Sequence, residues 1–70
     1  MNYYERIQKS IDYIEANLEN EIDLNRACRE AYMSLSNFYR LFFAIVGYPV
    51  KEYVRNRRIS LAAEELLNSN

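Results

Sequence analysis

Apolar residues recur at spacings of three and four in the first third of the chain. Within residues 3–18, the positions that follow this spacing are Ile7, Ile11, Ile14 and Leu18. Such positions fall on one face of an α-helix. Asn2 stands directly before the stretch, where a helix N-cap is expected. The pattern predicts a first helix over about residues 3–18.

A shorter apolar face follows over about residues 24–31. Its members are Leu24, Ala27, Cys28 and Ala31, and their spacing is that of a single helix face. Asp23 precedes them and has a side chain suited to an N-cap. We expect a short second helix here, with Cys28 as a small core residue.

The stretch SNFYRLFFAIVGYPV, residues 36–50, holds a single charge, Arg40. It is too short for a membrane-spanning helix, which needs about 20 apolar residues, and it lacks the alternation of a strand. Helical spacing fits instead, because the inward positions are Phe38, Leu41, Phe42 and Ile45. The positions left pointing outward are Ser36, Tyr39, Arg40 and Phe43.

This third helix is expected to follow Ser34 as its N-cap and to end at Gly47. A short helix, the link Tyr32-Met33-Ser34 and a capped helix form a helix-turn-helix arrangement. A fourth helix is expected from near Pro49, whose fixed φ suits a first turn, with fraying at residues 68–70. Its apolar positions are Tyr53, Val54, Leu61, Ala62 and Leu66.

These elements predict an all-α, four-helix domain with one helix-turn-helix and a long C-terminal helix. Seventy residues suffice for one small core, and a single Gly and a single Pro favour helices. The first ten residues are polar and charged, so no signal peptide is visible and a cytoplasmic location is expected.

The net charge of −1 does not by itself suggest a nucleic-acid binder, but the charges are unevenly distributed. Residues 1–34 carry four Lys or Arg against seven Asp or Glu, whereas residues 35–58 carry five basic residues against one acid. A local basic patch attracts an anion even when the total charge is near zero. With no His and one Cys, the sequence supports neither a metal site nor a cofactor, and no catalytic constellation is visible. We do not expect an enzyme.

Residues 23–47 and 52–67 together resemble the DNA-binding domain of the AraC/XylS family of transcription regulators. The family's pattern around the helix-turn-helix is matched by Ala31, Met33, Ser34, Phe38, Arg40, Leu41, Phe42 and Gly47. Its pattern on the following helix is matched by Tyr53, Arg58, Ala62, Leu66 and Leu67. The run from Arg57 to Ala63 is most similar to the MarA/SoxS/Rob branch.

The resemblance implies sequence-specific binding to double-stranded DNA, with a recognition helix in the major groove. It also implies a homeodomain-like fold in which two helix-turn-helix units are joined by a long connecting helix, here the fourth helix, so residues 1–70 are expected to be the first unit of a longer domain. Carried over position by position, the base-contacting residues are Ser36, Asn37, Tyr39 and Arg40. The N-terminal part of a recognition helix meets base edges in this way.

Phosphate contacts are expected from basic residues on the fourth helix. Lys51, Arg55 and Arg58 lie at i, i+4 and i+7, which gives a basic stripe. Arg57 and the hydroxyl of Ser34 are further candidates. For Arg58, an ion pair with Glu30 or another acid is an alternative role.

Two departures from the family pattern open other possibilities. Phe43 and Ala44 stand where the family usually has basic residues, so Phe43 and Val46 are expected to face solvent or a partner. This favours the alternative function, a protein-interaction or dimerisation module that uses the apolar surface of the third helix. Tyr32 occupies a turn position that often holds Gly. If the turn requires a positive φ, Tyr costs about 1 kcal/mol there; otherwise the turn has another shape.

Overall fold

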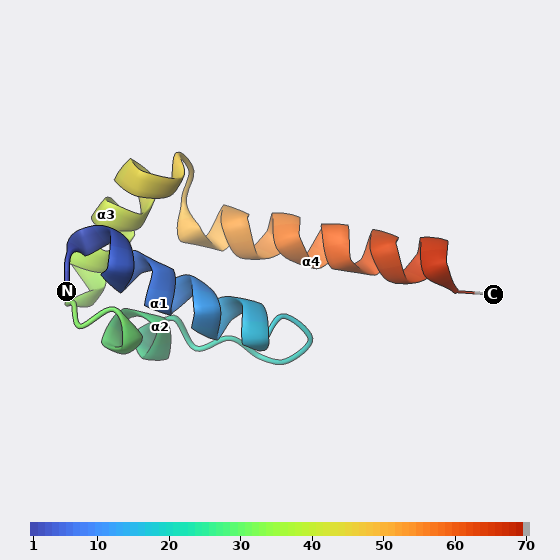
Figure 1. Ribbon diagram of the computed structural model, residues 1–70, viewed down its shortest axis with the longest axis horizontal. Coiled ribbons are helices and arrows are strands. Elements are labelled where there is room, and N and C mark those ends of the chain that lie inside the picture. The colour runs from blue at the N-terminus through green and yellow to red at the C-terminus, as the bar shows by residue number, and fades with distance from the viewer. Residues whose placement is uncertain (70) are drawn as a thin grey trace.

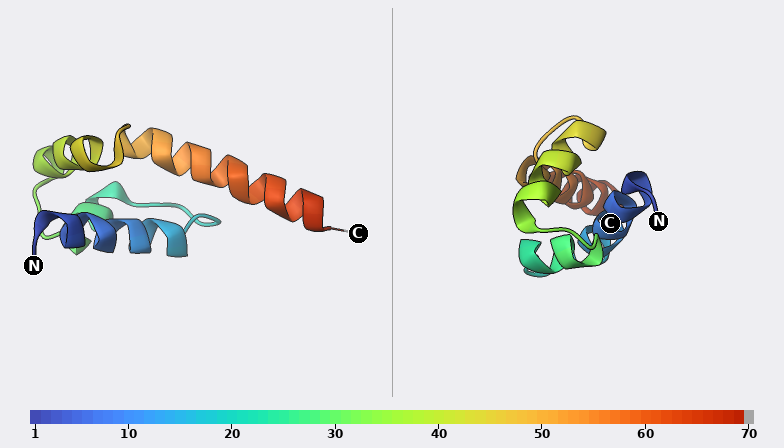
Figure 2. Two further views of the ribbon diagram at one scale, coloured as in Figure 1. Left: turned by 45° about the horizontal axis from the view of Figure 1, so that its top comes forward. Right: turned by 90° about the vertical axis from the view of Figure 1, so that its left-hand side faces the viewer.

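The computed structural model describes residues 1–69, and this part of the chain is folded into four helices without a strand. They are α1 (Tyr3–Ala16), α2 (Leu24–Glu30), α3 (Leu35–Val46) and α4 (Val50–Asn68). The first three gather at one end of the molecule, while α4 runs beside them and then extends past the end of α1 (Figures 1 and 2). The all-α, helix-turn-helix prediction is confirmed. Residue 70, part of the expected frayed end, lies outside the described residues.

Each of the first three helices begins at the N-cap that the sequence predicts. The side-chain oxygens of Asn2, Asp23 and Ser34 accept hydrogen bonds from backbone N–H groups two or three residues later, at 2.8, 2.9 and 3.4 Å. Pro49 differs slightly from expectation, because it is the extended N-cap residue of α4 and not part of its first turn. Such caps satisfy backbone donors that the helix itself leaves unpaired.

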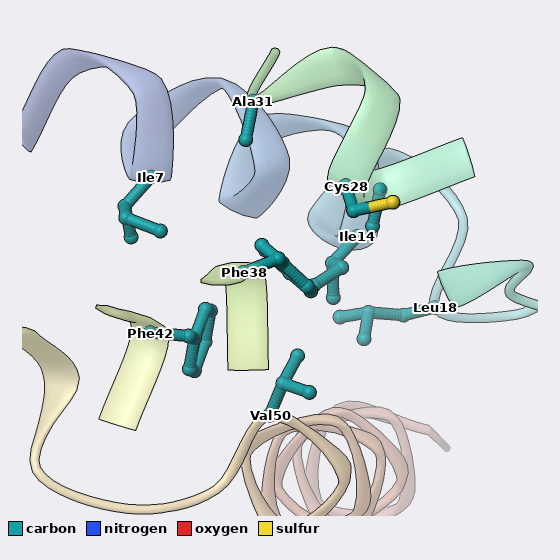
Figure 3. Packing of buried hydrophobic residues seen from close by; sticks show 9 residues of the cluster. Ile7, Ile14, Leu18, Cys28, Ala31, Phe38, Phe42 and Val50 are labelled. Atoms are coloured by element: carbon teal, nitrogen blue, oxygen red, sulfur yellow. The ribbon is translucent and has the colours of Figure 1, made fainter. Parts of the chain in front are cut away.

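The core is built from the faces that the apolar spacing predicts. Figure 3 shows Phe38 and Phe42 of α3 pointing toward α1, with Val50 at the start of α4 on the other side of the cluster. The buried hydrophobic residues are Ile7, Ile14, Leu18, Ala27, Cys28, Ala31, Phe38, Phe42 and Val50. The Phe38 and Phe42 rings meet edge to face, 5.7 Å between centroids. This packing fixes which side of α3 faces outward.

The far part of α4 departs from the predicted apolar face. Ala62 and Leu66, two of the predicted positions, are exposed. For Leu66 the reason is that the last turns of α4 extend past the other helices (Figure 1). Only Tyr53, Val54 and Leu61 of the predicted positions pack partly against the core. None of the helices in residues 1–69 is long and apolar enough to span a membrane.

The turn between α2 and α3 contains Tyr32 with φ of +58°. The first of the two alternatives for this residue is therefore correct, since the turn requires a left-handed backbone. Hydrogen bonds from the Tyr32 and Met33 N–H groups to carbonyls of α2, at 3.0 and 3.1 Å, close the turn. Gly47 ends α3 with φ of +98°, as its position predicts.

Candidate nucleic-acid interface

The outward face of α3 carries the residues that the sequence assigns to base contacts. Ser36, Asn37 and Arg40 are exposed, and Tyr39 is half-buried with its ring 6.1 Å from that of Phe38. Because the opposite face of α3 is anchored in the core, these side chains have a fixed direction. The structure therefore brings the four candidates together on the first two turns of one helix.

Arg40 is an exposed cation on this face and has one hydrogen-bond partner. Its Nη2 donates to Oδ1 of Asn37 at 3.1 Å, one turn earlier on the same helix. In the described part of the chain no carboxylate forms a salt bridge with it. The guanidinium thus keeps its charge uncompensated and most of its donors free, which suits a guanine edge with two acceptors.

Two surface hollows flank Arg40, one on each side of α3. The first lies toward the N-terminal end of α1 and is lined by residues that include Arg6, Ser34 and Asn37. The second lies toward the start of α4 and is lined by residues that include Tyr39, Phe43 and Lys51. Arg40 borders both. The outward face of α3, called the reading face below, therefore projects between two recesses. Each recess is lined by one further cation, Arg6 in the first and Lys51 in the second.

Arg57 forms its hydrogen bonds within the protein. Its Nε and Nη2 donate to the Glu15 carboxylate at 2.9 to 3.2 Å, and the Tyr53 hydroxyl donates to the same carboxylate at 3.0 Å. The hydrogen bonds from Arg57 lower the pKa of Glu15, although partial burial opposes the shift. Burial and the nearby carboxylate raise the pKa of Tyr53 to about 12. This cluster links α4 to α1, so the Arg57 side chain points away from the reading face.

Arg58 also has a role inside the fold. Its Nε donates to the carbonyl of Leu18 at 3.0 Å and its Nη2 to that of Asn20 at 2.7 Å. The alternative role of Arg58, an ion pair with Glu30 or another acid, is wrong: within residues 1–69 Arg58 forms no salt bridge, and Glu30 pairs with Arg26 at 3.5 Å within α2. Arg58 lies on the side of α4 that faces the end of α1, where the chain leaves the helix and has carbonyls to satisfy.

Lys51 and Arg55 remain exposed on α4, and within residues 1–69 neither forms a salt bridge. Both border a shallow hollow on α4, and Lys51 also borders the recess beside Arg40. Ser34 uses its oxygen as the N-cap acceptor of α3, which leaves its hydroxyl hydrogen free to donate. All three of these phosphate candidates have polar hydrogens without an acceptor in residues 1–69, and Ser34 and Lys51 also lie at or beside α3.

The two residues expected to face a partner behave differently. Phe43 is 53% exposed on the outward face of α3. Val46 is half-buried and packs against the core cluster, so its expected exposure is wrong. It falls on the side of α3 that turns toward the other helices. Of these two residues, Phe43 is the one that offers apolar surface to a partner.

Arg6 is a member of this surface that the sequence did not indicate. It lies on α1, about thirty residues before the reading helix, and its own helix face gives no local signal of DNA contact. Only the packing of α1 against α3 brings it beside Asn37 and Arg40.

Comparisons with known proteins match the chain over nearly its whole length. The HTH-type transcriptional activator AarP of Providencia stuartii is 38% identical over 64 residues, which are 91% of this chain and 47% of that protein. The uncharacterized HTH-type transcriptional regulator YbfP of Bacillus subtilis is 38% identical over 66 residues, 93% of this chain and 22% of that protein.

The multiple antibiotic resistance protein MarA of Escherichia coli is 30% identical over 64 residues, 91% of this chain and 50% of that protein. The chain thus spans half or less of the length of these relatives. No family model matches the chain, and no solved structure matches it. The similarity falls on the four helices described above.

Proposed function

The chain belongs to the AraC/XylS family of helix-turn-helix transcription regulators, and we propose that it binds DNA sequence-specifically through α3. The observation that carries this proposal is Arg40. It is exposed on the outward face of a helix whose other face is fixed in the core, its charge is uncompensated in the described chain, and recesses with further cations lie on both sides.

In this proposal α3 enters the major groove with its first two turns against base edges. Arg40 bonds the two acceptors of a guanine edge, and its hydrogen bond to Asn37 orients the guanidinium before contact. Ser36 donates to or accepts from a neighbouring base, and Tyr39 packs against a thymine methyl or bonds a base edge. When Arg40 turns to the guanine, its hydrogen bond to Asn37 is released, and the Asn37 amide can then bond an adenine.

Lys51 and Arg55 supply phosphate contacts from α4, and Ser34 supplies one from the start of α3. Arg57 and Arg58 instead hold α4 against α1, because their hydrogen bonds are directed into the protein. They act on DNA binding indirectly, by fixing where the first turns of α4 stand relative to α3. The two cationic phosphate contacts, Lys51 and Arg55, correspond to a log–log salt slope of about −2, to which the neutral hydroxyl of Ser34 adds nothing.

In a longer regulator, the last turns of α4 would carry a second helix-turn-helix unit. Support comes from the exposed Ile59, Leu66 and Leu67, which present apolar surface without a partner in the described residues. Phe43 gives a separate contact, and we assign it to self-association at high concentration, since its ring is half exposed beside the recess of Lys51.

The test compares Arg40→Ala with Arg55→Ala on two kinds of duplex, a site selected from a randomised pool and random DNA. Arg40→Ala should cost about 1–3 kcal/mol on the selected site and far less on random DNA. Arg55→Ala should lower the affinity for both duplexes alike and make the salt slope less steep by about one unit. If Arg40→Ala lowers the affinity for both duplexes equally, Arg40 does not contact base edges and the proposal loses its main support.

A further inference from the structure

The recess on the α1 side of α3 contains a cation whose role the proposed function leaves open. Arg6, in the second turn of α1, lines this recess together with Ser34, Asn37 and Arg40. Ser34 and Arg40 are respectively a candidate phosphate contact and the main candidate base contact. Arg6 therefore borders the reading face directly, although it belongs to a different helix.

Arg6 lacks hydrogen bonds within the protein of the kind that Arg57 and Arg58 form. Its Nε is fully covered and has no hydrogen-bond partner in the described residues, whereas Arg57 and Arg58 bond to a carboxylate and to backbone carbonyls. No salt bridge compensates its charge within residues 1–69. A half-buried guanidinium in this condition is under-satisfied, since a covered donor without a partner has lost its hydrogen bonds to water.

The contact that does hold Arg6 is with an aromatic ring. Its guanidinium carbon lies 5.7 Å from the centroid of the Tyr3 ring, one turn earlier on α1. Such a contact is weak and leaves the edge of the guanidinium able to bond an anion. The side chain is thus kept beside the recess without being neutralised.

A recognition helix in the major groove has a phosphate backbone on each side. Lys51 stands on the α4 side of α3, and Arg6 stands on the α1 side, with Arg40 on the reading face between them. We propose that Arg6 contacts a phosphate of the DNA strand on the α1 side, opposite the strand that Lys51 contacts. The inference rests on the proposed function and adds a second helix to the DNA-binding surface.

Arg6 should increase the affinity for DNA because its Nε has no hydrogen-bond partner in the unbound chain. When the guanidinium turns onto a phosphate it forms charge-assisted hydrogen bonds and gives up only the ring contact. No ion pair has to be broken first, unlike the case of Arg57. Arg6 should therefore strengthen binding to every duplex, with no preference for sequence.

The experiment measures the salt dependence of binding to a random-sequence duplex and to a duplex selected from a randomised pool. The variants are Arg6→Gln, Arg6→Lys and the control Arg26→Gln, which makes the same charge change on α2. Arg26 lies over the Tyr13 ring, pairs with Glu30 and lines neither recess beside α3. Thermal melts of all four proteins show whether each is folded.

Arg6→Gln should lower the affinity for both duplexes alike, by on the order of tenfold at low salt, and make the slope less steep by about one unit. Arg6→Lys should keep most of the slope, because it keeps the charge. Arg26→Gln should leave the slope near that of the unaltered chain.

Three results would overturn the proposal. The slope of Arg6→Gln could equal that of the unaltered chain, or Arg26→Gln could flatten the slope as much as Arg6→Gln does. Alternatively, both Arg6 variants could melt earlier and bind weaker with an unchanged slope, which is the behaviour of a structural residue. If the unaltered chain shows no salt-dependent binding at all, the proposed function fails first, and this inference fails with it.

Discussion

The ion pair between Arg57 and Glu15 allows a test of whether Arg57 stabilises the fold or contacts DNA. Arg57→Met keeps an unbranched apolar stem and removes the guanidinium, so Glu15 keeps only its hydrogen bond from Tyr53. The pair joins residues 42 positions apart in the sequence, and it fixes the middle of α4 to the last turn of α1. Losing it should loosen that attachment.

The magnitude follows from geometry and exposure. Arg57 bonds through two nitrogens at 2.9 to 3.2 Å, which is favourable, but the two side chains remain 36% and 32% exposed and water screens part of the attraction. Exposed pairs contribute up to about 1 kcal/mol, whereas breaking a fully buried pair costs about 3–5 kcal/mol. The loss in Arg57→Met should therefore lie near the value for exposed pairs and well below that for a buried pair. For a domain of this size it corresponds to a Tm lower by no more than roughly 4–8 °C.

The assays are thermal and urea unfolding of Arg57→Met, Glu15→Gln and the double variant, followed by salt titrations of DNA binding. A coupling energy clearly above zero in the double-mutant cycle would isolate the pair itself. Since Arg57 lowers the pKa of Glu15, its contribution is present above the ordinary pKa of about 4.5 and is lost as the pH falls below it. The difference between Arg57→Met and the unaltered chain should therefore shrink near pH 3.

DNA binding provides the result that would refute this reasoning. Arg57→Met should leave the salt slope unchanged, whereas Arg55→Ala should flatten it by about one unit. If Arg57→Met melts like the unaltered chain and instead flattens the slope, then the pair with Glu15 opens in solution and Arg57 is a phosphate contact.

Three further predictions concern the turn, the exposed ring and a pair of acids. Tyr32, 66% exposed at φ +58°, buries little, so Tyr32→Asn should raise the free energy of unfolding by up to about 1 kcal/mol and Tyr32→Val should lower it; equal urea midpoints would contradict this. Phe43→Lys should reduce self-association in sedimentation and tighten DNA binding, and an unchanged mass distribution with weaker binding would count against it. A hydrogen bond with Glu19 raises the pKa of Glu65, so the folded chain loses stability as Glu65 ionises and Glu65→Gln should raise the Tm at pH 7 but not at pH 3. An equal Tm shift at both pH values would exclude that cause.

The elements and their ends could be predicted from the sequence because they depend on neighbours. The caps at Asn2, Asp23 and Ser34 bond N–H groups only two or three residues away, and Gly47 adopts the left-handed backbone that glycine tolerates best. The inward face of α3 follows from a spacing of three and four, which only a helix places on one side. These features made the helix-turn-helix and the outward direction of Arg40 predictable.

The tertiary structure alone decided the roles of residues whose partners are far away in the sequence. In the sequence, Arg57 and Arg58 are phosphate candidates like Lys51 and Arg55, yet in the structure they bond to groups 38 to 42 residues earlier. Helical spacing cannot tell how far a neighbouring helix extends, so it could not show that Leu66 lies past the end of α1 while Val50 is buried. Arg6 borders the reading helix only because α1 packs against α3, and contacts of this kind are fixed by how the buried faces fit together and not by any local pattern.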